Sequence, residues 1–205
     1  MFKLYRNASV VLLLALLASG CLAPLSSNFT ARSLGPGKVE VDGGVLTLSG
    51  ALPACKIAVG LLSNFDLGFQ MESASLGVFG KYSFVNNRER GFSVAGVLGV
   101  GAVASGSYAY GGPVLSYKSK SLEPYFVARL NYVHYGRSED TFSDVHWEAG
   151  TYTYFQFTLG TIFWVTGNIG LDIEGSAFAG KLGLEDFGDF AVPSVVVLAG
   201  AKVRF

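Results

Sequence analysis

Large apolar residues alternate with glycine or polar residues over much of the chain. From Phe65 to Glu72 every odd position is large and apolar, and every even position is Gly or polar. The same period of two runs through 154–165 and 168–174. Successive side chains of a strand point to opposite faces, so this period indicates strands with one apolar face. An amphipathic helix would repeat every 3.6 residues instead.

The alternation and the turn residues between the segments predict about ten strands. They are expected at 38–48, 54–62, 65–72, 75–85, 91–103, 107–118, 122–135, 151–165, 168–179 and 193–205. Single-chain bacterial membrane barrels have an even number of strands. Merging the weakly alternating segments around 75–85 and 107–118 gives eight strands, which is the alternative. We therefore expect an all-β, antiparallel, up-and-down transmembrane β-barrel over residues 38–205.

The lengths of the connections predict how this barrel is oriented. The connections 63–64, 86–90, 119–121 and 166–167 are short and fall on one side, whereas the longest, 136–150 and 180–192, fall on the other. Outer-membrane barrels have short periplasmic turns and longer external loops. The C-terminus and the start of the first strand are therefore expected at the periplasmic face.

Composition fits one domain that faces lipid. Half of the 205 residues are hydrophobic and only 15% are charged. Fifteen Lys and Arg balance fifteen Asp and Glu, so no net field attracts nucleic acid. Beyond the N-terminus no apolar run reaches the ~18 residues of a membrane helix. If the chain crosses a bilayer, it does so with strands.

The N-terminus has the features of an export signal. Lys3 and Arg6 precede an apolar stretch at 10–18, and small residues lead to Cys21. The sequence Leu-Ala-Ser-Gly-Cys at 17–21 resembles the lipobox of bacterial lipoproteins, in which the cysteine is lipidated and becomes the new N-terminus. Ala18 stands where Leu is usual, which leaves ordinary cleavage open. We expect a signal peptide at 1–20 and lipid on Cys21.

The residues between this signal and the first strand are expected to form a periplasmic tether at 21–37. Leu22, in place of Asp, resembles sorting to the outer membrane, and 30–37 resembles the lead-in to the first strand of many bacterial outer-membrane barrels. With Cys21 lipidated, Cys55 would have no intramolecular partner, so no structural disulfide is expected.

The C-terminus ends in an alternating series with a terminal aromatic residue. This series resembles the closing strand of bacterial outer-membrane barrels, whose final aromatic is part of the signal read by the barrel-assembly machinery. The implied assembly signal is Val197, Ala199, Ala201, Val203 and Phe205. The resemblance implies a location in the bacterial outer membrane.

The polar faces of the strands predict a lumen of mixed charge. A barrel of eight to ten strands is about filled by its own side chains, whereas open porin channels need roughly sixteen strands or more. We expect a paired, plugged lumen, and a narrow polar channel is the alternative. The inward candidates are Glu40, Asp42, Lys56, Asp66, Gln70, Glu72, Lys81, Glu123, Arg129, Asn131, Asp172, Glu174, Lys202 and Arg204.

Glycines 96, 99 and 101 lie within one alternating segment. A phosphate-binding loop would need a strand-to-helix turn there, so these glycines are expected to give a neighbouring side chain room to pack.

Candidate chemistry is confined to two histidines near the external rim. His134 and His146 lie close in sequence to acidic residues at 139, 140, 144 and 148. This layout is similar to that of omptin proteases, which place Asp and His pairs at the rim, but no local motif matches. Alternate positions 144, 146 and 148 could meet a divalent cation. A solvated acidic loop is the favoured interpretation, with no catalytic residue, metal or cofactor.

The sequence thus favours a barrel with a structural, surface-interaction or adhesion role. The expected partners are membrane lipids, lipopolysaccharide and the barrel-assembly machinery, and nucleic acid is not among them. Aromatic residues near the long loop are candidate surface contacts: Phe142, Trp147, Tyr152 and Tyr154. A rim hydrolase, either an omptin-like protease or a lipid-modifying enzyme, is the alternative.

Overall fold

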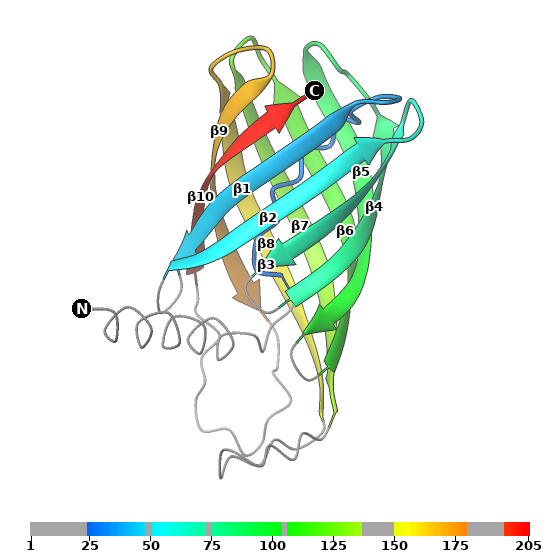
Figure 1. Cartoon of the computed structure of the whole chain (residues 1–205), viewed down its shortest axis with the longest axis vertical. Coiled ribbons are helices and arrows are strands. Elements are labelled where there is room, and N and C mark those ends of the chain that lie inside the picture. The colour runs from blue at the N-terminus through cyan, green and yellow to red at the C-terminus, as the bar shows by residue number, and fades with distance from the viewer. Residues whose placement is uncertain (1–23, 48–50, 73–74, 104–105, 137–149, 180–194) are drawn as a thin grey trace, which may run out of the picture.

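The chain forms ten antiparallel strands that close into one barrel (Figure 1). The computed structural model describes residues 24–47, 51–72, 75–103, 106–136, 150–179 and 195–205. The strands are β1 (Val39–Thr47), β2 (Ala51–Gly60), β3 (Phe65–Glu72), β4 (Ser75–Val85), β5 (Gly91–Val103), β6 (Gly106–Lys118), β7 (Leu122–Tyr135), β8 (Gly150–Trp164), β9 (Ile169–Ala179) and β10 (Val195–Arg204). Within these ranges no helix is long and apolar enough to cross a membrane.

Each strand pairs with its neighbours in sequence, and β10 returns to pair with β1. The prediction of ten strands is confirmed, and the alternative of eight is not what the chain forms. β3, β4, β5 and β7 begin and end at the predicted residues. β2 begins three residues earlier than predicted, at Ala51.

The seam between β1 and β10 closes the sheet without a free edge. Its register pairs Glu40 with Arg204 and Val41 with Val203. The last residue continues this ladder, since the Phe205 amide donates to the Val39 carbonyl at 2.9 Å and the Val39 amide donates to the Phe205 carbonyl at 3.2 Å. Every strand therefore has a partner on both sides, which a barrel in lipid requires.

The two faces of the wall differ as the alternation predicts. On β9, Leu171 and Ile173 are exposed, whereas Asp172 and Glu174, which alternate with them, are buried in the lumen. Outward-facing apolar side chains occur on all ten strands, and inward positions carry most of the charged residues. Cys55, a free cysteine, is half-buried on the outward side of β2.

The barrel has two ends that differ in their connections. The end named here the C-terminal mouth holds Phe205, the start of β1 and the connections 61–64, 86–90, 119–121 and 165–168. The opposite end, the distal mouth, is where β1 ends and β2 begins; the connections 137–149 and 180–194 join strands at this end and lie outside the described residues. The two longest connections thus lie at one end, as predicted, whereas short connections occur at both ends, with 48–50, 73–74 and 104–105 at the distal mouth.

The residues that precede β1 run inside the barrel (Figure 1, dark blue). Residues 24–34, named here the lumen segment, are buried apart from Ser26, which is partly buried. Sequence analysis predicts a tether at 21–37 between membrane and barrel, and the structure places this part of it in the lumen instead. The prediction rested on the position of these residues between the export signal and the first strand, which does not distinguish a tether from an extended chain enclosed by a sheet.

Candidate functional site

The candidate site is the lumen, where charged side chains of the wall surround the lumen segment. All of the predicted inward residues are buried except Arg204, which is partly exposed at the C-terminal mouth. Their orientation follows from the strand period alone. Their partners could not be predicted, because most of them bind the lumen segment.

Two glutamates near the distal half of the lumen accept hydrogen bonds from four successive backbone amides. Glu72 on β3 accepts the Leu25 amide at 2.7 Å and the Ser26 amide at 2.9 Å, and also the Ser26 hydroxyl at 2.5 Å. Glu174 on β9 accepts the amides of Ser27 and Asn28 at 2.8 and 2.9 Å. A buried carboxylate that accepts backbone N–H groups offsets part of its desolvation cost, so these glutamates fix the segment while they are themselves stabilised.

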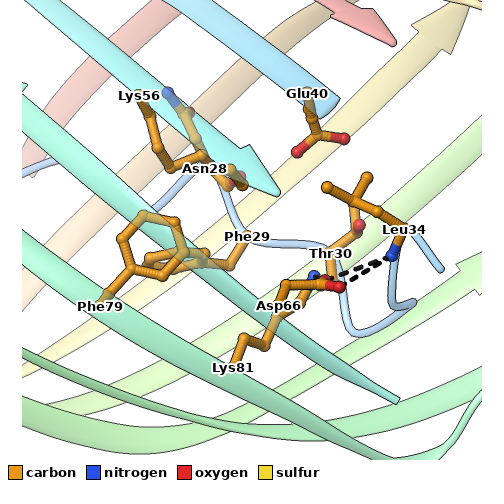
Figure 2. A pocket seen from close by; sticks show the side chains of 10 residues that line it. Asn28, Phe29, Thr30, Leu34, Glu40, Lys56, Asp66, Phe79 and Lys81 are labelled. Carbon is orange, nitrogen blue, oxygen red and sulfur yellow. Dashed lines mark hydrogen bonds and ion pairs between the residues drawn. The ribbon is translucent and has the colours of Figure 1, made fainter. Parts of the chain in front are cut away.

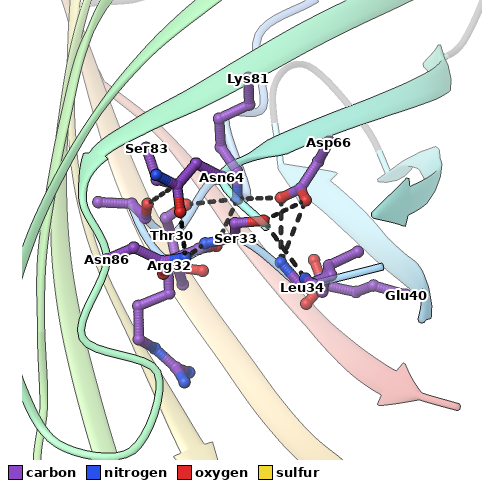
Figure 3. A network of polar contacts seen from close by, with 12 residues as sticks. Thr30, Arg32, Ser33, Leu34, Glu40, Asn64, Asp66, Lys81, Ser83 and Asn86 are labelled. Carbon is purple, nitrogen blue, oxygen red and sulfur yellow. Dashed lines mark hydrogen bonds and ion pairs between the residues drawn. The ribbon is translucent and has the colours of Figure 1, made fainter. Parts of the chain in front are cut away.

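A third carboxylate holds the segment near the C-terminal mouth (Figure 3). Asp66 on β3 accepts the Ser33 hydroxyl at 2.7 Å and the Leu34 amide at 3.1 Å. The Ser33 amide donates to the Asn86 side-chain oxygen at 3.1 Å. Two residues before Ser33, the Ala31 amide donates to the Ser116 hydroxyl at 3.0 Å.

Cationic and amide side chains of the wall bind the segment's carbonyl oxygens. Lys81 on β4 donates to the carbonyls of Thr30 and Arg32 at 2.8 and 2.7 Å. Lys56 and Lys202 donate to the Asn28 carbonyl. At the distal end Arg129 donates to the Pro24 carbonyl and Gln156 to the Leu25 carbonyl, both at 2.5 Å. The mixed charge of the lumen thus matches a peptide backbone: carboxylates accept its amides, and cations donate to its carbonyls.

Two side chains of the segment add specific contacts. The Phe29 ring meets the Phe79 ring edge to face at a centroid distance of 4.9 Å, and the Lys56 ammonium lies 4.4 Å from the Phe29 centroid (Figure 2). The Arg32 guanidinium forms an ion pair with Glu123, which also accepts the Trp164 indole N–H at 2.8 Å. These contacts fix the register of the segment, since moving it by one residue would exchange Phe29 and Arg32 with neighbours of a different kind.

Charged lumen residues also pair with one another within the wall. Lys56 lies 2.9 Å from Asp42, Lys81 lies 3.1 Å from Asp66, and Lys202 lies 3.3 Å from both Glu40 and Asp42. A buried charge without a partner costs several kcal/mol, so pairing is what makes this lumen compatible with burial.

Small inward residues leave the room that the segment occupies. Around the segment the wall presents Ala58 and Gly60 on β2, Ser83 on β4 and Ala95 on β5. A Cβ on Gly60 would stand 2.0 Å from the Gly35 carbonyl oxygen, so the chain passes directly over that glycine. A cavity of about 10 Å³ remains beside Phe29, roughly the space for one water molecule (Figure 2).

Glycines elsewhere in the wall accommodate tyrosine rings. Cβ atoms on Gly99 and Gly101 would fall 2.4 Å from the Tyr110 ring and 2.5 Å from the Tyr108 ring. Sequence analysis predicts that these glycines provide packing space, and the structure confirms it. Tyr108 and Tyr110 in turn hydrogen-bond Gln70 at 3.2 and 2.9 Å, filling the lumen on the β3 to β6 side.

The residues of the predicted assembly signal lie together on one face. Val197, Ala199 and Ala201 are exposed on the outward face of β10, Val203 is partly exposed there, and Phe205 is 73% exposed. Cys21, the predicted lipidation site, lies outside the described residues.

Of the rim candidates, only His134 lies within the described residues. His134 is exposed on β7, and its Nδ1 lies 3.1 Å from the Thr151 hydroxyl. His146 and the acidic positions 139, 140, 144 and 148 lie outside the described residues, as do Phe142 and Trp147. Tyr154 is buried, so the prediction that it is a surface contact is wrong. It stands at an even-numbered position of β8, and the even-numbered side chains from 154 to 164 face the lumen.

Sequence reasoning missed the lumen segment, the largest component of the site. The available signal was indirect: carboxylates and lysines faced a lumen that had too few bulky inward residues to fill a barrel of ten strands. The run of short side chains from Ser26 to Ser33, broken by Phe29 and Arg32, is compatible with an enclosed chain but does not by itself indicate one.

The sequence matches no protein-family model and no curated protein. Solved structures similar in fold include the N-terminal β-barrel domain of Pseudomonas aeruginosa OprF, with 14% identity and a TM-score of 0.45 over 83% of this chain and 99% of that one. KdgM porin in complex with disordered oligogalacturonate gives 12% and 0.46, over 81% and 99%. Ail, the attachment invasion locus protein of Yersinia pestis, gives 14% and 0.37, over 83% and 99%. At these identities the similarity concerns the fold alone.

Proposed function

We propose that this protein is a bacterial outer-membrane β-barrel whose lumen is closed by its own lumen segment, and that it has a structural or surface-interaction role. The observation that carries the proposal is the binding of residues 24–34 along the lumen by the wall. The signal peptide at 1–20 and the lipid on Cys21 belong to the same proposal and rest on the sequence.

The outward face supports a membrane location. Exposed apolar side chains on every strand form a surface far larger than a soluble monomer tolerates, and a closed barrel has no other partner sheet to cover it. Six of the exposed aromatic residues lie toward the C-terminal mouth, as in a girdle at one membrane interface. They are Tyr82, Phe84, Phe92, Tyr117, Phe163 and Phe205.

The connections support the orientation. The two longest connections join strands at the distal mouth, as the external loops of outer-membrane barrels do, so the distal mouth faces outward. The two longest connections, 137–149 and 180–194, then extend from the cell surface, where they would meet lipopolysaccharide or another surface.

The lumen segment argues against an open channel. Its backbone binds wall residues from near the distal mouth, at Glu72, to near the C-terminal mouth, at Asp66. Ion flow would require these hydrogen bonds to break while their charged partners stayed buried, which costs about 1–3 kcal/mol for each unsatisfied group. A closed lumen leaves the outer loops and the outer face as the surfaces for function.

Single-channel recording in planar lipid bilayers tests this proposal. The mature protein should give no conductance steps, whereas Glu72→Ala combined with Glu174→Ala should give them, because four segment amides lose their acceptors. Asn131→Ala is the matched control: its side chain is equally buried in the lumen, and no hydrogen bond joins it to the segment among the described residues. That variant should stay closed.

Deletion of residues 24–34 provides a second measurement that does not depend on those two glutamates. Conductance that is the same in the native protein and in this deletion would contradict a closing role for the segment and would favour the narrow channel. Steps that appear only in the deletion and in the double-alanine variant would support the proposal.

A further inference from the structure

The direction in which the lumen segment runs is fixed by its contacts. Leu25 is buried near the distal mouth against Leu46, Leu52 and Leu198. Leu34 lies near the C-terminal mouth, where its amide binds Asp66 and the next residue, Gly35, packs over Gly60. From Pro24 onward the chain therefore travels from the distal mouth to the C-terminal mouth, and only then enters β1.

The entry point at the distal mouth is held by polar and apolar contacts together. Arg129 on β7 and Gln156 on β8 bind the carbonyls of Pro24 and Leu25, and Glu72 on β3 binds the Leu25 amide. These residues come from strands on different sides of the barrel, so they fix the chain across the lumen. The apolar cluster buries Leu25, which is only 4% exposed, whereas a mobile chain end would leave this side chain exposed.

The length of the preceding chain decides where the mature N-terminus lies. Two residues lie between Cys21 and Pro24, and the three Cα-to-Cα steps span at most roughly 11 Å. The lumen between the levels of Leu46 and Val39 corresponds to seven residues of a tilted strand, or roughly 18 Å along the axis. Because the lumen is occupied by the segment itself, the chain before Pro24 cannot return to the C-terminal mouth.

We propose that the chain enters its own barrel from outside the cell, so that the mature N-terminus is displayed at the external surface. This inference rests on the orientation given under the proposed function. An acyl group on Cys21 would then insert into the outer leaflet, beside the distal mouth, rather than into the periplasmic leaflet that an ordinary tether implies. The ligand class at this N-terminus is the lipid of the outer leaflet, including lipopolysaccharide.

Labelling of intact cells with a maleimide carrying polyethylene glycol of several kilodaltons tests the inference. The protein carries Cys55→Ala, which serves as the blank, and a Gly-Ser spacer of about ten residues with one cysteine is inserted between Leu22 and Ala23. Such a spacer extends roughly 15–20 Å, enough to clear neighbouring loops. Its thiol should react in intact cells.

Two single-cysteine variants in the same background report the orientation separately. Thr151→Cys is exposed near the distal mouth and should react in intact cells, whereas Lys120→Cys, exposed in the turn 119–121, should react only after the outer membrane is permeabilised. A spacer thiol that behaves like Lys120→Cys would overturn external display and leave the orientation intact. Reversed behaviour of Thr151→Cys and Lys120→Cys would overturn the orientation, and external display with it.

Discussion

At the scale of single residues, position within the strand decides environment more than residue type does. Ile173 is 49% exposed and Glu174 is 3% exposed, although the two residues are consecutive. The inward residue binds two amides of the lumen segment, and the outward one has no partner other than the medium around the barrel. A substitution should therefore be judged by the face and depth at which it falls.

Depth in the membrane gives a prediction for two residues of equal exposure. Leu159 and Val165 face outward at 69% and 67% exposure, but Leu159 lies six residues farther from the C-terminal mouth. That separation corresponds to roughly 15 Å of depth, about the half-thickness of a bilayer core. Leu159→Arg should lower the free energy of unfolding by ~2–4 kcal/mol and Val165→Arg by ~0–1, measured by urea unfolding in lipid vesicles. Equal losses would contradict a bilayer around β8.

At the scale of elements, the lumen segment behaves as a chain that is bound through its backbone. Most of its hydrogen bonds use backbone amides and carbonyls. The contacts that depend on side-chain identity come from Ser26, Ser27, Phe29, Arg32 and Ser33. Substitutions at Thr30 or Ala31 that preserve size should therefore leave the element in place.

The close passage of the segment over β2 gives a prediction for this element. Gly60→Ala should cost about 1–3 kcal/mol, because its Cβ would overlap the Gly35 carbonyl and the segment must move. Hydrogen exchange should accelerate at the amides of Ser33 and Leu34, which bind Asn86 and Asp66.

Gly43→Ala is the matched control for this substitution. A Cβ there meets nothing within 4 Å, so exchange at the segment should not change and stability should stay within about 0.5 kcal/mol. Faster exchange in both variants would show that the effect comes from losing a glycine in a strand and not from displacing the segment.

The barrel wall could be predicted from the sequence, and the lumen segment could not. The wall was predictable because a period of two puts Asp66, Gln70 and Glu72 on one face whatever surrounds them. The segment was not, because a chain bound by its backbone leaves no periodic side-chain pattern. Its partners were visible as inward charges, but a lysine that binds a carbonyl and a lysine that binds a carboxylate are identical in sequence.

At the scale of the whole molecule, closure depends on β10 meeting β1. Phe205 and Phe84 are similarly exposed aromatics near the C-terminal mouth, at 73% and 67%. If the terminal aromatic is read during assembly, Phe205→Ala should reduce the folded protein in the outer membrane several-fold, whereas Phe84→Ala should not. Immunoblots of membrane fractions measure the difference.

Refolding in detergent separates recognition from stability in this comparison. Loss of one partly exposed ring should cost each variant no more than ~3 kcal/mol, so both should still form barrels in detergent. If Phe205→Ala also fails there, the residue acts through stability. Normal abundance of Phe205→Ala in cells would show that the terminal ring is not an assembly signal.

The path of the lumen segment makes the molecule mechanically interlocked, like a ring on an axle that belongs to the same chain. An acylated N-terminus would be too bulky to pass through the filled lumen, so the lumen segment could not be threaded into a barrel that had already closed. The seam between β1 and β10 would then have to close around a segment already in place. Glu72, Glu174 and Asp66 are the wall residues that hydrogen-bond this segment. Closure of the wall and docking of the segment would then be one folding event, in which the strands pair around the segment.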